Sequence, residues 1–257
     1  MSRPGGRPSA TPLRPATARL RIMLVAAAVC PAPPLLVPEV AAGAAAELAD
    51  ARTACSDALA VLAAARPDRL VVVGAAGADH TGPYPQGSRG SFRGFGVAAD
   101  VRLGEGEEGP RVLPTSLAVA AWLLARARWG AAPVEGLGVA EPLEADACLR
   151  TGRELAVTDD RVALLVMGDG SACRTVKAPG YLDERATAFD AEAARALGAA
   201  DTAALAALDP GLARELKAAG RAPWQVLAGA AEGAGLDGRL LYDEAPYGVG
   251  YFVATWS

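Results

Sequence analysis

Histidine is nearly absent from this chain: His80 is the single one among 257 residues. The chain cannot by itself build a metal site that needs two or three histidines. Its four cysteines are dispersed and form no C-x-x-C pair, so the sequence gives no sign of a structural zinc site. Isolated cysteines of this kind indicate buried thiols in a reducing compartment, and we expect a cytoplasmic protein.

Long apolar runs and clusters of positive charge are also missing. No run of about 20 apolar residues is free of proline and charge, so we expect no transmembrane helix. The net charge is −4, and the first 22 residues contain five arginines and no acid, so −4 minus 5 leaves −9 on the other 235. An acidic body disfavours a phosphate backbone as partner. We therefore expect a small-molecule substrate, with no nucleic acid and no membrane.

The N-terminus differs in composition from the rest of the chain. Residues 1–22 contain four prolines and no apolar period, which predicts a disordered extension before a domain over 23–257. The arginines ahead of residues 23–30 imitate a secretory signal. However, prolines 31, 33 and 34 interrupt the apolar stretch, and cleavage at the small residues 44–46 would delete the first expected strand. Met23 as the natural start is the simpler interpretation.

Apolar runs and helical periods alternate along the remaining chain. Residues 24–30 and 70–74 are typical of buried strands, and residues 39–65 between them have the spacing of a helix. Residues 161–167 form the strongest further strand pattern. This alternation predicts an α/β fold, a three-layer α/β/α sandwich with a mostly parallel central sheet.

Two loops that follow predicted strands contain most of the candidate site residues. The glycine-rich segment 75–96 contains Asp79 and His80, and the strand at 161–167 is followed by Gly-Asp-Gly-Ser. Because ligands bind at the carboxyl ends of parallel strands, His80 and Asp169 are candidate catalytic groups. An ordinary loop histidine and a tight glycine turn remain the alternative interpretations.

Polar side chains of the same loops are candidates for substrate binding. Arg89 and Arg93 in the first loop would recognise an anion if they converge, and Ser171 in the second would add a hydroxyl. Solvated surface is the alternative for the arginines. Ser171 as a nucleophile is disfavoured because Gly-x-Ser-x-Gly is absent.

Several segments, in their order, resemble the subunit-B superfamily of class III extradiol ring-cleavage dioxygenases, and in particular an uncharacterised actinobacterial-type branch. The likeness spans roughly residues 23–257. It rests on Cys30–Leu36, the polar loop after Val73, Met167–Ser171, Phe189–Asp190 and Tyr247–Tyr251.

The resemblance implies ring opening of a catechol-like substrate by O2 at a non-haem Fe(II). Family members hold this iron with two histidines and a carboxylate, which leaves positions open for substrate and O2. Ala32 stands where the first histidine is expected, and His80 stands at the second. The loop 168–174, where an acid/base histidine is expected, offers Asp169 as its only acid. Glu232 and Glu244 are candidates for the carboxylate ligand.

Three functions follow as hypotheses. The first is an Fe(II) dioxygenase-like oxidoreductase with an eroded metal site, formed by His80, Asp79 and Glu232, which is either altered or inactive. The second is a metal-assisted reaction on a small anionic molecule, for which carboxylate-rich ligands such as Asp79 and Asp169 suit Mg²⁺ or Mn²⁺. The third is a non-catalytic binding or partner subunit, with or without a homo-oligomer.

Overall fold

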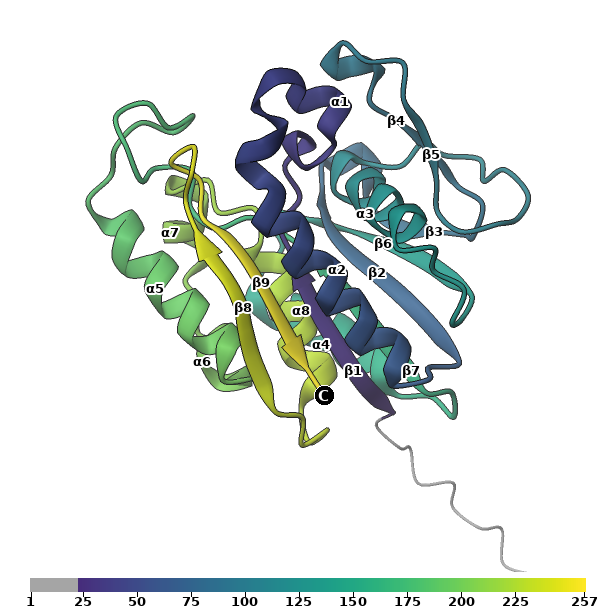
Figure 1. Cartoon of the computed structure of the whole chain (residues 1–257). Coiled ribbons are helices and arrows are strands. Elements are labelled where there is room, and N and C mark those ends of the chain that lie inside the picture. The colour runs from purple at the N-terminus through teal and green to yellow at the C-terminus, as the bar shows by residue number, and fades with distance from the viewer. Residues whose placement is uncertain (1–22) are drawn as a thin grey trace, which may run out of the picture.

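The computed structural model describes residues 23–257 (Figure 1). The predicted extension over residues 1–22, and with it the choice of Met23 as the start, lies outside the described residues. No helix in the described range is long and apolar enough to cross a membrane. All four cysteines are buried free thiols, which confirms that part of the expectation from their spacing.

The centre of the molecule is a seven-stranded sheet. In spatial order its strands are β3 (Gly82–Tyr84), β6 (Val134–Ala140), β2 (Arg69–Ala76), β7 (Val162–Met167), β1 (Leu24–Cys30), β9 (Tyr251–Trp256) and β8 (Gly238–Glu244). The strands β6, β2, β7 and β1 are parallel, whereas β3, β9 and β8 are antiparallel to their neighbours.

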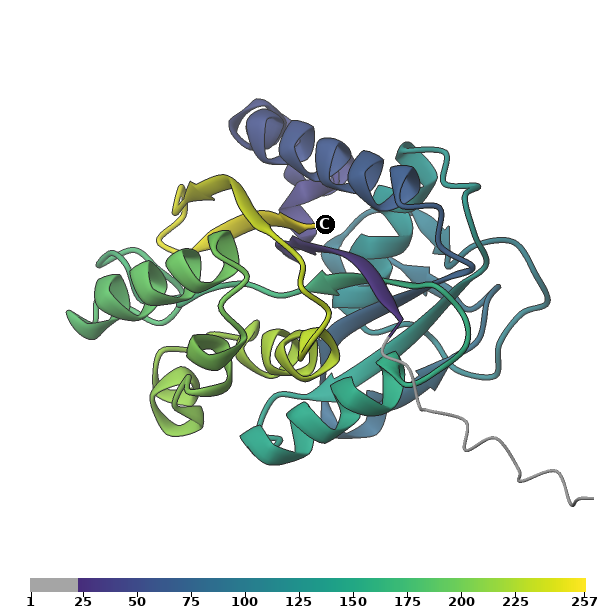
Figure 2. The same ribbon diagram turned by 90° about the horizontal axis from the view of Figure 1, so that it is seen from below.

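Helices cover both faces of this sheet, and Figure 2 shows the layers from below. One face is covered by α2 (Ala49–Ala64) and α3 (Thr115–Arg126), with the short η1 (Pro34–Leu36), α1 (Pro38–Ala41) and η2 (Ala42–Leu48). The other face is covered by α4 (Ala145–Ala156), α5 (Arg185–Gly198), α6 (Thr202–Ala206), α7 (Pro210–Glu215) and α8 (Arg221–Ala231). The predicted three-layer α/β/α sandwich is thereby confirmed.

The strand β7 explains why the central sequence patterns are so apolar. All six of its residues are buried, because β1 and β2 flank it and helices lie above and below. Its side chains alternate between two cores: Leu164 and Val166 pack toward α8, and Leu165 and Met167 pack toward α2. Met167 is aligned with the last residue of β1, so the carboxyl ends of these two strands meet at one edge of the sheet.

The prediction of a single helix over residues 39–65 is wrong for the first part of this range. The chain forms α1, then the 3-10 segment η2, and only then the long helix α2. Ala42 adopts a positive φ of 48° at the end of α1, which interrupts the α-helical hydrogen bonds. Because the segment is rich in alanine, its apolar periodicity gives no sign of the break.

The glycine-rich segment after β2 leaves the main sheet. It forms η3 (Ala78–His80), the edge strand β3, and a separate two-stranded sheet of β4 (Arg89–Ser91) and β5 (Asp100–Arg102), with η4 (Arg93–Phe95) between them. Figure 1 shows this excursion beside α3. It therefore carries its polar side chains on a substructure of its own.

Candidate functional site

The loop after β7 is held close to its neighbours by glycine. The Gly168 N–H donates to the Cys30 carbonyl at 3.0 Å, and the Gly220 N–H donates to the Asp169 carbonyl at 2.8 Å. A side chain at position 168 would bring its Cβ to 2.4 Å from the Gly220 Cα, so only glycine fits there. The loop thereby fixes Asp169 at the edge where β1 and β7 end.

The carboxylate of Asp169 is bound by the first loop of the chain. The Ala32 N–H donates to Asp169 Oδ1 at 2.7 Å. In the sequence Pro-Ala-Pro-Pro at 31–34, Ala32 is the only residue with a backbone N–H, because proline has none. That donor needs an acceptor when it is shielded from water, and Asp169 supplies it.

The same carboxylate lacks a cationic partner. No lysine or arginine of the described residues lies within ion-pair distance of Asp169. Asp169 is partly buried, and the loss of water around its carboxylate raises its pKa to about 7, while the Ala32 N–H opposes the rise. Near neutral pH, Asp169 is therefore present in both protonation states and is suited to give or accept a proton.

Tyr251 lies beside this group, and Tyr247 lies near Tyr251. Tyr251 begins β9, which runs antiparallel to β1, so it lies near the end of β1, where Ala32 follows. Tyr251 is 3% exposed, and its pKa is raised by burial and by the charge of Asp169. Burial raises the pKa of Tyr247, and so does its acidic neighbour Glu47. Asp169, the Ala32 amide and these two rings make up what we call the Asp169 site.

Ser171, two residues further on, belongs to a different environment. Its side chain is fully buried, with its hydroxyl donating to Asp190 Oδ2 at 2.8 Å and its N–H to Asp190 Oδ1 at 2.7 Å. Arg174 pairs with the same carboxylate at 3.1 Å. The predicted substrate contact of Ser171 is corrected: the hydroxyl is enclosed and already bound, and it joins the loop to α5.

His80 and Asp79 lie elsewhere along the sheet edge. Both side chains are exposed in η3, and the His80 carbonyl accepts a hydrogen bond from the Tyr84 hydroxyl at 2.8 Å. The His80 carbonyl also lies against Gly138 of β6, and β2 separates β6 from β7 in the sheet. The structure therefore does not bring His80 into contact with Asp169, contrary to our expectation of one shared site.

Glu232 and Glu244, the candidates for a carboxylate ligand, are also placed apart. Glu232 follows α8 and forms a two-point ion pair with Arg153 of α4, with both N–O distances at 2.7 Å. Glu244 is exposed at the end of β8. Glu232 is thus already paired, and it does not join His80 and Asp79.

The residues do not fit the Fe(II) that the resemblance implies. In the part of the chain that the structure describes, no three His, Cys, Asp or Glu side chains are grouped so that they could hold a metal ion. The residue after the Cys30–Pro31 turn is Ala32, whose methyl group has no donor atom. The assembled trio of His80, Asp79 and Glu232 is therefore corrected, and we derive no step through iron.

Arg89 and Arg93 lie on the excursion after β2. Arg89 pairs with Glu108 at 3.0 Å, and Arg93 pairs with Asp100 at 2.7 Å, so each arginine has an acidic neighbour. Arg89 and Asp100 also line an open cavity of about 510 Å³ beside the two-stranded sheet of β4 and β5. The two arginines thus share one substructure, but neither contacts Asp169 in the described range.

Sequence reasoning predicted Asp169 but missed what surrounds it. The local patterns indicate neither the Tyr251 ring beside Asp169 nor the hydrogen bond from the Ala32 amide. The proline pattern was the available signal, since it marks Ala32 as a single donor between residues that cannot donate.

Comparisons with known proteins support the fold and leave the function open. No family model matches the chain, and no curated protein matches it. A solved structure, described as uncharacterized protein JW3007 from Escherichia coli K12, matches with a TM-score of 0.52 and 16% sequence identity. The match covers 91% of this chain and 100% of that one. At this identity the likeness shows a shared fold alone.

Proposed function

We propose that this chain binds a small phenolic molecule at the Asp169 site and that Asp169 exchanges a proton with it. The observation that supports the proposal is the set of contacts of this carboxylate. It accepts a hydrogen bond from the neutral Ala32 N–H, and it forms no ion pair with a described cation. The site lies at the carboxyl ends of β1 and β7, where open α/β sheets bind ligands. The resemblance to extradiol dioxygenases supports a catechol-like ligand.

The chemistry of the proposal requires only the chain's own groups. When protonated, Asp169 donates a hydrogen bond to a ligand oxygen; when ionised, it accepts the proton of a hydroxyl. The raised pKa of Asp169, about 7, makes both states accessible near neutral pH. The rings of Tyr247 and Tyr251 supply an apolar, aromatic surface against which a phenol can pack.

Ring opening by O2 remains a prediction of the resemblance, and it is not part of the proposal. A metal-assisted reaction using Asp79, His80 and Asp169 is disfavoured because Asp79 and His80 are exposed over the β6 edge and Asp169 is bound at the end of β1. A non-catalytic binding subunit is compatible with the same site, since proton exchange with a bound ligand does not require turnover.

The test uses catechol as the probe and nuclear magnetic resonance of protein carrying ¹³C-labelled aspartate. We expect catechol to shift the Asp169 carboxyl signal and the Tyr251 ring signals. In Asp169→Asn the affinity should fall about tenfold, which corresponds to the loss of one hydrogen bond to a charged group. Asp79→Asn, an equal change of charge at an exposed position, is the matched control and should leave the affinity unchanged.

Two results would overturn the proposal. One is catechol binding that Asp79→Asn weakens and Asp169→Asn does not. The other is a purified chain that holds about one iron per molecule, opens catechol in the presence of O2 and loses the metal on His80→Ala.

A further inference from the structure

A second polar centre lies on the opposite face of the sheet, at the start of α8. The side chain of Arg221 is only 2% exposed, and its guanidinium donates to the backbone carbonyls of Glu141 and Leu143. It also donates to Gln225 Oε1 at 3.0 Å. None of the acidic residues described in the structure forms an ion pair with Arg221.

A buried cation without a counter-charge is costly. Carbonyl oxygens satisfy the N–H groups of Arg221, but they do not neutralise its positive charge. Desolvation accordingly lowers the pKa of Arg221, although the nearby charges of Glu144 and Asp209, which form no ion pair with it, oppose the fall. An anion beside the guanidinium would relieve this cost.

A cavity of about 430 Å³ adjoins Arg221, between α7 and the loop that follows β6. This volume is in the range of small-molecule pockets. Pro142, Ala213 and Ala218 give it apolar walls, and Arg214 and Lys217 contribute two further cations. Glu141 is the one acid in the lining, so its formal charge is positive in a chain whose net charge is −4.

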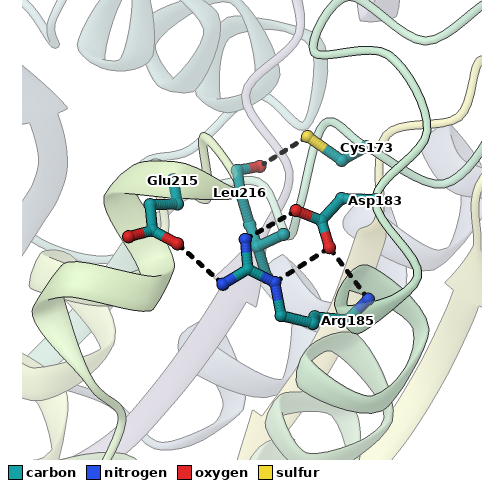
Figure 3. A network of polar contacts seen from close by, with 5 residues as sticks. All are labelled: Cys173, Asp183, Arg185, Glu215 and Leu216. Atoms are coloured by element: carbon teal, nitrogen blue, oxygen red, sulfur yellow. Dashed lines mark hydrogen bonds and ion pairs between the residues drawn. The ribbon is translucent and has the colours of Figure 1, made fainter.

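The neighbouring acid of α7 does not neutralise these cations. Glu215 lies between Arg214 and Lys217 in sequence, but its carboxylate pairs with Arg185 at 2.7 Å. Figure 3 shows this arrangement: Arg185 is held by Glu215 on one side and by Asp183 on the other. Because Glu215 pairs with Arg185, its carboxylate does not pair with the cations that line the cavity.

We propose that this cavity binds a small organic anion, with its carboxylate or phosphate group facing Arg214, Lys217 and Arg221 and its apolar part against Ala213 and Ala218. Guanidinium groups suit either anion because both accept two parallel hydrogen bonds. The proposal is independent of the Asp169 site. Ala213 and Ala218 belong to the core under α4 and α8, whereas Tyr251 belongs to the core under α2 and α3.

Benzoate and inorganic phosphate are the probes, and nuclear magnetic resonance of the full chain is the measurement. We expect at least one probe to shift backbone signals of α7 and the Nε–H signal of Arg221. The double variant Arg214→Gln, Lys217→Gln should weaken binding about tenfold or more. The matched control Arg126→Gln, Arg128→Gln removes two exposed cations at the end of α3, on the opposite face, and should bind as the natural chain does.

The two probes also separate the sources of the anion. Binding of benzoate alone assigns a carboxylate ligand, and binding of phosphate alone assigns a phosphorylated one. The proposal is overturned if neither probe shifts Arg221, or if both double variants weaken binding equally, since the effect would then reflect overall charge. All four substituted residues are exposed, and the unfolding free energy of each double variant, measured alongside binding, separates lost binding from lost stability.

Discussion

Asp169 belongs to the short loop after β7 and Asp190 of α5 binds the same loop, but the surroundings of the two carboxylates differ. Asp190 is 1% exposed and is met by two hydrogen bonds from Ser171 and by the guanidinium of Arg174. Asp169 accepts one hydrogen bond, from the neutral backbone amide of Ala32. Burial raises the pKa of both groups, but for Asp190 the donors and Arg174 oppose the rise, whereas for Asp169 only the amide does so.

This difference separates a carboxylate with structural partners from the one that we propose exchanges a proton with a ligand. The charge of Asp190 is partly compensated by Ser171 and Arg174, and the carboxylate joins the loop after β7, α5 and the loop before β9. The charge of Asp169 is not compensated, so the group holds a proton in the range where proton transfer is useful. Buried carboxylates are thus better distinguished by their partners than by their burial.

Removing Asp190 should have the largest effect on stability. Asp190→Ala leaves Arg174 without its partner and Ser171 without an acceptor, and we expect a loss of about 3–5 kcal/mol in the free energy of unfolding. Urea unfolding followed by circular dichroism would measure it. A loss below about 1 kcal/mol would contradict the structural role that we give to Asp190.

The second prediction concerns the pH dependence produced by Asp169. Its pKa is about 7 in the folded chain and about 3.9 when unfolded, so between these values the folded chain binds a proton that the unfolded chain releases. Stability should therefore fall as pH rises from about 4 to about 7 and then level off, by at most about 4 kcal/mol from this group.

Asp169→Asn should remove this contribution. The amide oxygen of asparagine can still accept the Ala32 N–H, so the variant should equal the natural chain near pH 4 and exceed it in stability at pH 8. The difference between the two unfolding free energies, measured across pH, isolates the group. Asp79→Asn serves as control, since an exposed carboxylate should give no such difference. A flat difference for Asp169→Asn would place the Asp169 pKa near its ordinary value.

Local sequence patterns account for much of the fold. The unbroken apolar run at 162–167 predicts a strand buried on both faces, and β7 is one. The Gly-Asp-Gly-Ser that follows points to the sheet edge, where Asp169 lies. The strand and the turn after it both depend on residues that are close in sequence, so a local sequence pattern can predict them.

The site as a whole depends on contacts between distant segments. Asp169 contacts Ala32, 137 positions away, and Ser171 contacts Asp190, 19 positions away, so two residues of one short loop have unrelated partners. His80 follows a central strand as predicted, but the chain then crosses β6 to form β3, which carries the histidine away. Residue spacing does not predict where His80 lies, because tertiary packing determines that β3 pairs with β6 at the edge of the sheet.

A smaller effect is expected at Ser171. Ser171→Ala removes the hydroxyl donor but leaves the N–H of residue 171 and Arg174 on Asp190, so we expect a loss of about 1–2 kcal/mol. The same variant should leave catechol binding at the Asp169 site unchanged, because the serine faces the Asp190 side. A variant with full stability and weakened catechol binding would contradict the division of the loop into two environments.

The smallest effect is expected where a carboxylate is paired at the surface. Glu232 is bound by Arg153 in good geometry, as Asp190 is by Arg174, but both side chains of the former pair are more than 40% exposed. Water and salt compensate such a pair, so Glu232→Gln should cost less than about 1 kcal/mol of unfolding free energy and the cost should shrink as salt is added. The effect of Asp190→Ala should be less sensitive to salt, because Asp190 itself is shielded from solvent even though Arg174 is partly exposed. If Glu232→Gln instead destabilised the chain as strongly as Asp190→Ala at high salt, burial would not be what distinguishes the two ion pairs.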